Sequence, residues 1–210
     1  MMEQENKESI SNRVKTIKQS FRLMMDGAIA QSMRDKGVNY HLNWGATLPR
    51  LREKADEIGY DYHLAIALWK ENVRECKILA TMIMPPNEIH PDVIDIWMEQ
   101  TETLEIAEQA SMNLYQYLPY APMKAYQWIA TNKEFCQICG FHVLSRLFAN
   151  GQEPNERGIS EFLDQADAAL QSSSVAVRKA ALNSLNHFAA LGLVYERLAN
   201  SVIRMNFGSC

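Results

Sequence analysis

The sequence predicts an all-α fold in which antiparallel helix pairs stack into a right-handed superhelix, an α-α solenoid. Apolar residues recur at helical spacing along nearly the whole chain, whereas sustained period-two alternation is not found. The connections between the expected helices are short, so consecutive helices should pack as antiparallel neighbours. A single domain over residues 1–210 accounts for the length of the chain, and we expect a monomer.

Glycine and aspartate mark the boundaries of the first helices. In chain order the expected helices cover residues 4–34, 47–58, 61–69, 72–83, 91–98, 102–117, 122–129, 133–149, 158–170, 174–189 and 191–205. Gly37 ends the first of them, which carries one long or two short helices. Gly59 stands where a C-terminal cap belongs, and Asp61 is placed to cap the next helix at its N-terminus.

Prolines and a second polar cap mark the later boundaries. Pro85-Pro86 stops the helix before it, and Pro91 occupies a first helical position. Pro122 opens a later helix in the same way, and Asn132 is placed to cap the helix that follows. Residues 150–157 form the most loop-like stretch of the sequence.

The charge balance argues mildly against a dedicated nucleic-acid binder. The formal net charge is -4, whereas such proteins usually carry a basic footprint. The charges are unevenly distributed, because residues 1–84 hold 13 Lys/Arg against 11 Asp/Glu and residues 85–210 hold 8 against 14. Only the N-terminal part is therefore expected to offer a basic face without local clustering.

The four cysteines predict neither a disulfide framework nor a metal site. Cys136 and Cys139 have C-x-x-C spacing but lie within an apolar helical pattern, and no second ligand pair accompanies them. We therefore expect two small buried thiols and no metal site at this motif. The sequence shows no secretory signal and no apolar run long enough to span a bilayer, which favours a cytoplasmic protein that makes no use of a membrane.

Four segments recur at intervals of roughly 30–40 residues, the size of a two-helix repeat. They begin at Val73, Ala107, Cys136 and Val177, and small residues recur where neighbouring helices would approach closely. The stretch from Ser174 to Leu185, with Val-Arg followed by Ala and Leu, resembles the second helix of a HEAT repeat. A single helix pair cannot bury its apolar face alone, so stacked pairs share one core.

The segment 43–80 carries a more specific resemblance. Asn-Trp-Gly-Ala-Thr-Leu-Pro-Arg-Leu-Arg at 43–52 is followed by Leu-Ala-Ile-Ala-Leu-Trp at 64–69 and by Val-Arg-Glu-Cys-Lys-Ile-Leu-Ala at 73–80. Together these segments resemble the DNA alkylation repair family, helical-repeat glycosylases that remove alkylated purines. The resemblance is good over residues 38–86, weaker to about 150, and generic HEAT beyond.

The resemblance implies a function and a candidate catalytic residue. It implies a concave, positively charged groove that binds duplex DNA, and hydrolysis of the N-glycosidic bond of an alkylated purine beside an acidic group, without metal or cofactor. The family's acidic position matches Glu108, and its tryptophan position matches Leu104. The family's arginine should fall near residues 137–139, where no arginine stands, and Arg146 lies about two turns later.

These departures leave an alternative function open. The alternative is a non-catalytic repeat protein that binds DNA structures or a protein partner, and a scaffold without a nucleic-acid role is a third interpretation. For DNA contact the candidate residues are basic side chains on the expected helices: Arg50, Arg52, Lys70, Arg74, Lys77, Arg146, Arg178 and Lys179. We expect a packing role for His142, and one solvated acidic helix face from residue 99 to Glu108.

Overall fold

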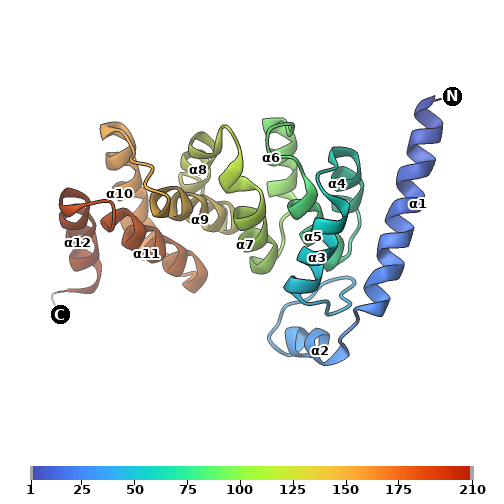
Figure 1. Ribbon diagram of the computed structural model, residues 1–210. Coiled ribbons are helices and arrows are strands. Elements are labelled where there is room, and N and C mark those ends of the chain that lie inside the picture. The colour runs from blue at the N-terminus through green and yellow to red at the C-terminus, as the bar shows by residue number, and fades with distance from the viewer. Residues whose placement is uncertain (1, 209–210) are drawn as a thin grey trace. The chain divides into compact units, whose positions relative to one another are not determined.

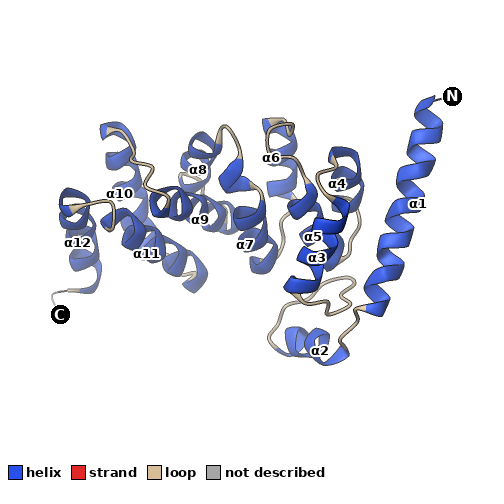
Figure 2. Ribbon diagram, viewed as in Figure 1, coloured by secondary structure: helices blue, strands red, loops and turns tan. Residues whose placement is uncertain are grey.

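The structure, a computed structural model, describes residues 2–208, with side chains from Ser9 onward, and this part of the chain contains helices and no β-strand (Figures 1 and 2). The predicted all-α class is therefore confirmed. The chain divides into two compact units, unit 1 (Met1–Ile106) and unit 2 (Ala107–Cys210). The helices of unit 1 are α1 (Met2–Leu23), α2 (Gly27–Asp35), α3 (Leu48–Ile58), α4 (Tyr62–Trp69), α5 (Arg74–Ile83) and α6 (Pro91–Glu99).

The division between the units falls inside α7 (Leu104–Asn113). Unit 2 continues with a short 3-10 helix, η1 (Tyr115–Tyr117), and with the helices α8 (Ala121–Ile129), α9 (Glu134–Ala149), α10 (Glu156–Leu170), α11 (Val175–Ala189) and α12 (Leu193–Phe207). The predicted long N-terminal segment is thus two helices, and the loop-like stretch at 150–157 is the connection before α10 together with the first two residues of that helix.

Several of the predicted helix boundaries are confirmed by the capping contacts. The Asp61 carboxylate accepts the backbone N–H of Leu64 at 2.9 Å, which satisfies one of the unpaired donors at the start of α4. Gly59 follows α3 with φ +72°, and its N–H donates to the Ala55 carbonyl. Pro91 is the first residue of α6.

The predicted cap at Asn132 is wrong. Helix α9 begins at Glu134, and Lys133 occupies the N-cap position without a side-chain hydrogen bond. The hydroxyl of Thr131 instead accepts the Lys133 N–H at 3.4 Å, so the connection before α9 forms its own local turn.

The predicted acidic helix face is also wrong. Glu99 ends α6, and Glu102 lies in the connection before α7, so the acidic residues do not share one helix. The hydroxyl of Thr101 donates to the Trp97 carbonyl at 2.9 Å, near the end of α6. Glu105 is half-buried and bonded within unit 1, as described below.

Unit 1 is built on α5, which packs against both α3 and α4, while α1 lies along α4 (Figure 1). The largest aromatic contact is a stacked pair, Trp69 on α4 and Trp97 on α6, with ring centroids 4.2 Å apart. The indole N–H of Trp69 donates to Gln100 at 2.8 Å, so its one polar atom is paired. Trp69 is therefore a core residue of unit 1.

Unit 2 is built on α9, which packs against α8 on one side and α11 on the other. Gly140 permits the close approach to α8, because a Cβ at this position would lie 2.6 Å from Ile129 Cγ2 and 2.8 Å from the Ala125 carbonyl oxygen. Three phenylalanines then join α9 to α10 and α11, since Phe162 lies 5.0 Å from both Phe148 and Phe188 between ring centroids.

The thiols of α9 are buried, as the sequence predicted. Cys139 donates to the Ala107 carbonyl at 3.4 Å, and burial raises the pKa of its thiol to about 12. A thiol that stays protonated at neutral pH is a poor nucleophile and a poor metal ligand. Over residues 2–208, no helix combines the length and the apolar character that crossing a bilayer requires.

Candidate functional site

A pocket of about 340 Å³ in unit 2 gathers the polar side chains of three helices. We call it the Glu108 pocket, and it is lined by Glu108, Gln109, Ser111, Met112, His142, Ser145, Arg146, Asn183 and His187. The first four come from α7, the next three from α9 and the last two from α11. The volume lies within the range of small-ligand pockets in proteins.

Helical spacing explains why these residues share one pocket. On α9 His142, Ser145 and Arg146 lie three and four positions apart, and on α11 Asn183 and His187 lie four apart, so each set occupies one helix face. The Asn183 amide donates to the Ser145 hydroxyl at 2.8 Å and joins the two faces. The pocket is therefore held by helices rather than by loops.

The carboxylate of Glu108 faces an imidazole. His142 Nε2 lies 4.0 Å from Glu108 Oε1, and the Glu108 side chain is 45% exposed. Burial, and then the nearby charge of Arg146, lower the pKa of His142. His142 is therefore neutral at pH 7, and it forms an ion pair with Glu108 only in more acidic solution. The prediction of a packing role for His142 is incomplete, because its side chain also lines the pocket.

Among the residues predicted to contact DNA, Arg146 lines the Glu108 pocket. Its side chain is exposed, as are those of Arg50, Arg52, Lys70 and Lys179. Arg50 and Arg52 are two positions apart on α3 and so point in different directions. Lys179 lies on α11, outside the residues that line the pocket.

Arg178 and Lys77, which are also predicted DNA-contact residues, have partners within the protein. The Arg178 guanidinium donates to the carbonyls of Ser172 and Ser173 and closes the turn before α11. Lys77 lies 4.5 Å above the Trp69 ring, where the aromatic face stabilises its charge. Burial lowers the pKa of this lysine, which is half-buried. Both side chains contribute to local structure.

Arg74, predicted as a phosphate contact, is buried in unit 1 and is removed from the candidates. Its side chain is 2% exposed. Two parallel bonds join it to Glu105, from Nη2 to Oε1 at 2.6 Å and from Nε to Oε2 at 2.8 Å. Nη1 donates to the Ala46 carbonyl at 2.8 Å and to Glu75 Oε1 at 3.2 Å. No guanidinium nitrogen is left for a phosphate group.

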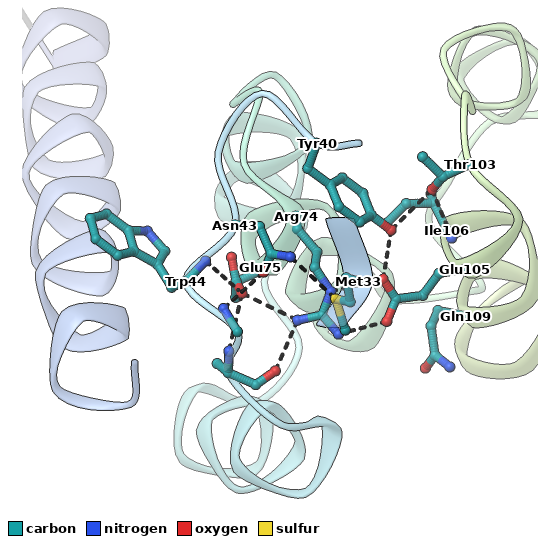
Figure 3. Close-up of polar contacts among 12 residues, drawn as sticks. Met33, Tyr40, Asn43, Trp44, Arg74, Glu75, Thr103, Glu105, Ile106 and Gln109 are labelled. Atoms are coloured by element: carbon teal, nitrogen blue, oxygen red, sulfur yellow. Dashed lines mark hydrogen bonds and ion pairs between the residues drawn. The ribbon is translucent and has the colours of Figure 1, made fainter. Parts of the chain in front are cut away.

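The Arg74 cluster, which also includes Tyr40, Glu75 and Glu105, fixes the loop before α3. Glu75 Oε1 accepts the backbone N–H groups of Trp44 and Ala46 at 3.1 and 3.2 Å, and the Tyr40 hydroxyl donates to Glu105 at 2.6 Å (Figure 3). Burial alone would raise the pKa of Glu105, but the bonds and charge of Arg74 lower it below its ordinary value. Glu105 is therefore charged at neutral pH.

The described side chains form no cluster suited to binding a metal ion. Within the described part of the chain, no group of three or more histidine, cysteine, aspartate or glutamate residues is arranged to hold a metal ion.

Comparison with known proteins identifies the family. The family model described as DNA alkylation repair enzyme matches residues 17–190, which is most of the chain. The chain belongs to the DNA alkylation repair enzyme family. No curated protein sequence matches this family member significantly.

A solved structure supports the fold of this DNA alkylation repair family member. It is described as "A new family of proteins related to the HEAT-like repeat DNA glycosylases with affinity for branched DNA structures". The two chains are 18% identical, with a TM-score of 0.81 over 91% of this chain and 82% of the other. At this identity the similarity establishes a HEAT-like repeat fold, which the repeat spacing predicted.

The family member keeps only part of the site implied by the sequence resemblance. Glu108 lines a pocket, whereas Leu104, which the resemblance matches to the family's tryptophan position, is 41% exposed on α7. The Glu108 pocket contains no aromatic side chain other than its two histidines. Sequence reasoning missed Asn183 and His187, although their four-residue spacing on a predicted helix was a usable signal.

Proposed function

We propose that the protein binds DNA through the Glu108 pocket and recognises DNA structure rather than base sequence. The observation that carries the proposal is the composition of this pocket, in which an exposed arginine, two histidines and the amide of Asn183 come together. Arginine, histidine and amide side chains are common donors to phosphate and sugar oxygens. Family membership and the solved neighbour, whose description names affinity for branched DNA, support the same proposal.

The test is binding to DNA of different shapes. Fluorescence anisotropy with an intact duplex and a four-way junction of the same sequence measures affinity over a series of salt concentrations. Arg146→Ala should weaken binding to both, and should reduce the slope of log K against log salt by about 1, because one phosphate contact is lost. An Arg157→Ala variant is the matched control, since Arg157 is an exposed arginine of unit 2 outside the pocket.

Two results would contradict the proposal. One is the absence of binding to either DNA at low salt. The other is an equal loss of affinity in the Arg146→Ala and Arg157→Ala variants, which would place the contact outside the Glu108 pocket.

A second candidate function, hydrolysis of the N-glycosidic bond of an alkylated purine, is favoured by the position of Glu108. Its carboxylate is half exposed inside the pocket and lies beside His142. In such a reaction the C1′–N bond breaks, and its electron pair neutralises the positively charged alkylated base. Water adds to C1′ and loses a proton to the carboxylate, whose negative charge also stabilises the oxocarbenium-like transition state.

Release of methylated purines from a treated duplex measures this activity. Glu108→Gln removes the charge and the basicity while keeping the size of the side chain, so base release should fall on the order of a hundredfold or more, with DNA affinity largely retained. If the wild-type protein binds DNA but releases no 3-methyl- or 7-methyl-purine, the protein is a non-catalytic member of the family.

A further inference from the structure

A groove in unit 1 is not used by the proposed DNA site. It lies between α1 and α4 and has a volume of about 480 Å³. We call it the α1–α4 groove, and it is lined by Ile10, Ser11, Val14, Lys15, Lys18, His63, Ile66, Ala67, Lys70 and Glu71. Figure 1 shows the two helices side by side.

The lining of the α1–α4 groove combines apolar and basic side chains, and each of the two helices contributes both kinds. Ile10 and Val14 on α1 face Ile66 on α4, and of these only Val14 is fully buried. The basic groups come from both helices, with Lys15 on one and Lys70 on the other. A third lysine, Lys18, is already paired with Glu71 at 2.6 Å.

This pattern favours a helix over a DNA backbone as the occupant. Residues 10–18 of α1 span about 12 Å at 1.5 Å per residue, which is the length of two helical turns. An amphipathic helix presents apolar residues at i, i+3, i+4 and i+7, with polar residues on both sides of that stripe. A DNA backbone has no apolar stripe to cover the isoleucines that line the groove.

We propose that the α1–α4 groove binds a short acidic amphipathic helix of a protein partner. The apolar stripe of that helix covers Ile10, Val14 and Ile66, and its flanking carboxylates lie against Lys15 and Lys70. The charge pattern of the groove is complementary to such a helix on both sides, which steers association and fixes its register. The proposal is independent of the Glu108 pocket, which belongs to unit 2.

The probe is a synthetic peptide of about 16 residues, long enough to form a helix, with leucine along one face and glutamate on the others. Fluorescence anisotropy with the full chain measures its binding. A peptide with lysine in place of glutamate and a scrambled peptide of the same composition should both bind at least tenfold more weakly. A Kd above about 1 mM for the acidic peptide would overturn the proposal.

Three variants locate the peptide. Lys15→Glu combined with Lys70→Glu should weaken peptide binding on the order of tenfold or more, because both flanking attractions become repulsions. Ile66→Ser should weaken it severalfold without a change in charge. The matched control is Lys36→Glu combined with Lys133→Glu, which gives the same change in net charge at two exposed lysines outside the groove and should leave peptide affinity unchanged.

Thermal unfolding of each variant separates a lost contact from a lost fold. Two further measurements, competition with DNA and sedimentation, distinguish two other occupants of the groove. If a junction DNA displaces the peptide and the Lys15→Glu/Lys70→Glu variant loses DNA affinity, the groove belongs to the DNA site. If sedimentation shows wild-type self-association that this variant abolishes, the occupant is a second copy. Either result would overturn the proposal.

Discussion

The charge of Arg74 is buried in unit 1 between the carboxylates of Glu75 and Glu105. Its guanidinium joins α5 to Glu105 and, through the Ala46 carbonyl, to the loop before α3. Burying a charge is costly unless it is paired and hydrogen-bonded, and here every nitrogen of the group has a partner. Removing one member leaves the others buried without compensation.

Arg74→Met should therefore destabilise the protein by about 3–5 kcal/mol, because Glu75 and Glu105 lose their counter-charge. The free energy of unfolding from urea denaturation, followed by circular dichroism, measures the change. Arg52→Met is the control, since Arg52 is an exposed arginine of the same unit, and it should change stability by less than about 0.5 kcal/mol. Similar losses in the two variants would show that the Arg74 cluster contributes no particular stability.

At the level of helices and loops, unit 1 depends on a close approach at Gly45. The residue has φ +73°, and a Cβ there would lie 2.1 Å from the Asp26 carbonyl oxygen. Asp26 is the N-cap of α2, where its carboxylate accepts the N–H groups of Ala28 and Ile29 at 3.0 Å. The loop before α3 is therefore packed directly onto the start of α2.

Gly45→Ala should destabilise the protein by more than about 3 kcal/mol, since it combines a steric overlap with an unfavourable φ. Gly59→Ala is a matched control, because Gly59 has φ +72° but nothing within 4 Å of its Cβ position. That variant should lose less, about 1–3 kcal/mol, the cost for alanine of a backbone conformation with positive φ and extended ψ that is nearly confined to glycine. Urea denaturation of both variants checks the difference, and equal losses would mean that the loop simply moves aside.

The sequence predicted those elements whose signals are local. Asp61 and Gly59 act within one helical turn of their positions, so their capping roles could be predicted from spacing alone. The role of Arg74 could not, because its partner Glu105 lies 31 residues away and a basic residue in a helix gives no sign of burial. His142 was assigned to packing for the same reason, since the pocket that it lines forms only when α7, α9 and α11 come together.

Over the whole molecule, the charge of unit 2 bears on how it can bind DNA. Unit 2 holds eight Lys/Arg and eight Asp/Glu, so its net charge is zero when the histidines are neutral. The N-terminal part that was expected to offer a basic face ends at residue 84, whereas unit 1 extends to Ile106. Residues 85–106 contribute six acidic residues and no Lys or Arg, which leaves unit 1 with a net charge of -4.

Protonation of His142 should therefore strengthen DNA binding. His142 is faced by Glu108 of α7, by Arg146 of its own helix and by Asn183 and His187 of α11. Its pKa is lowered, first by burial and then by Arg146, so it gains its proton only as the pH falls below its ordinary value of about 6.5. This proton adds a positive charge beside the bound phosphates and one more counterion-release contact.

Affinity for a DNA junction, measured by anisotropy at constant ionic strength, should rise severalfold between about pH 7.5 and about pH 5.5. The rise should disappear in the His142→Gln/His187→Gln variant, whose pocket contains no histidine. It should persist in His41→Gln/His63→Gln, which removes two exposed histidines of unit 1. An increase retained by the first variant would mean that groups outside the Glu108 pocket set the pH dependence, and the DNA site would then have to be sought elsewhere on the chain.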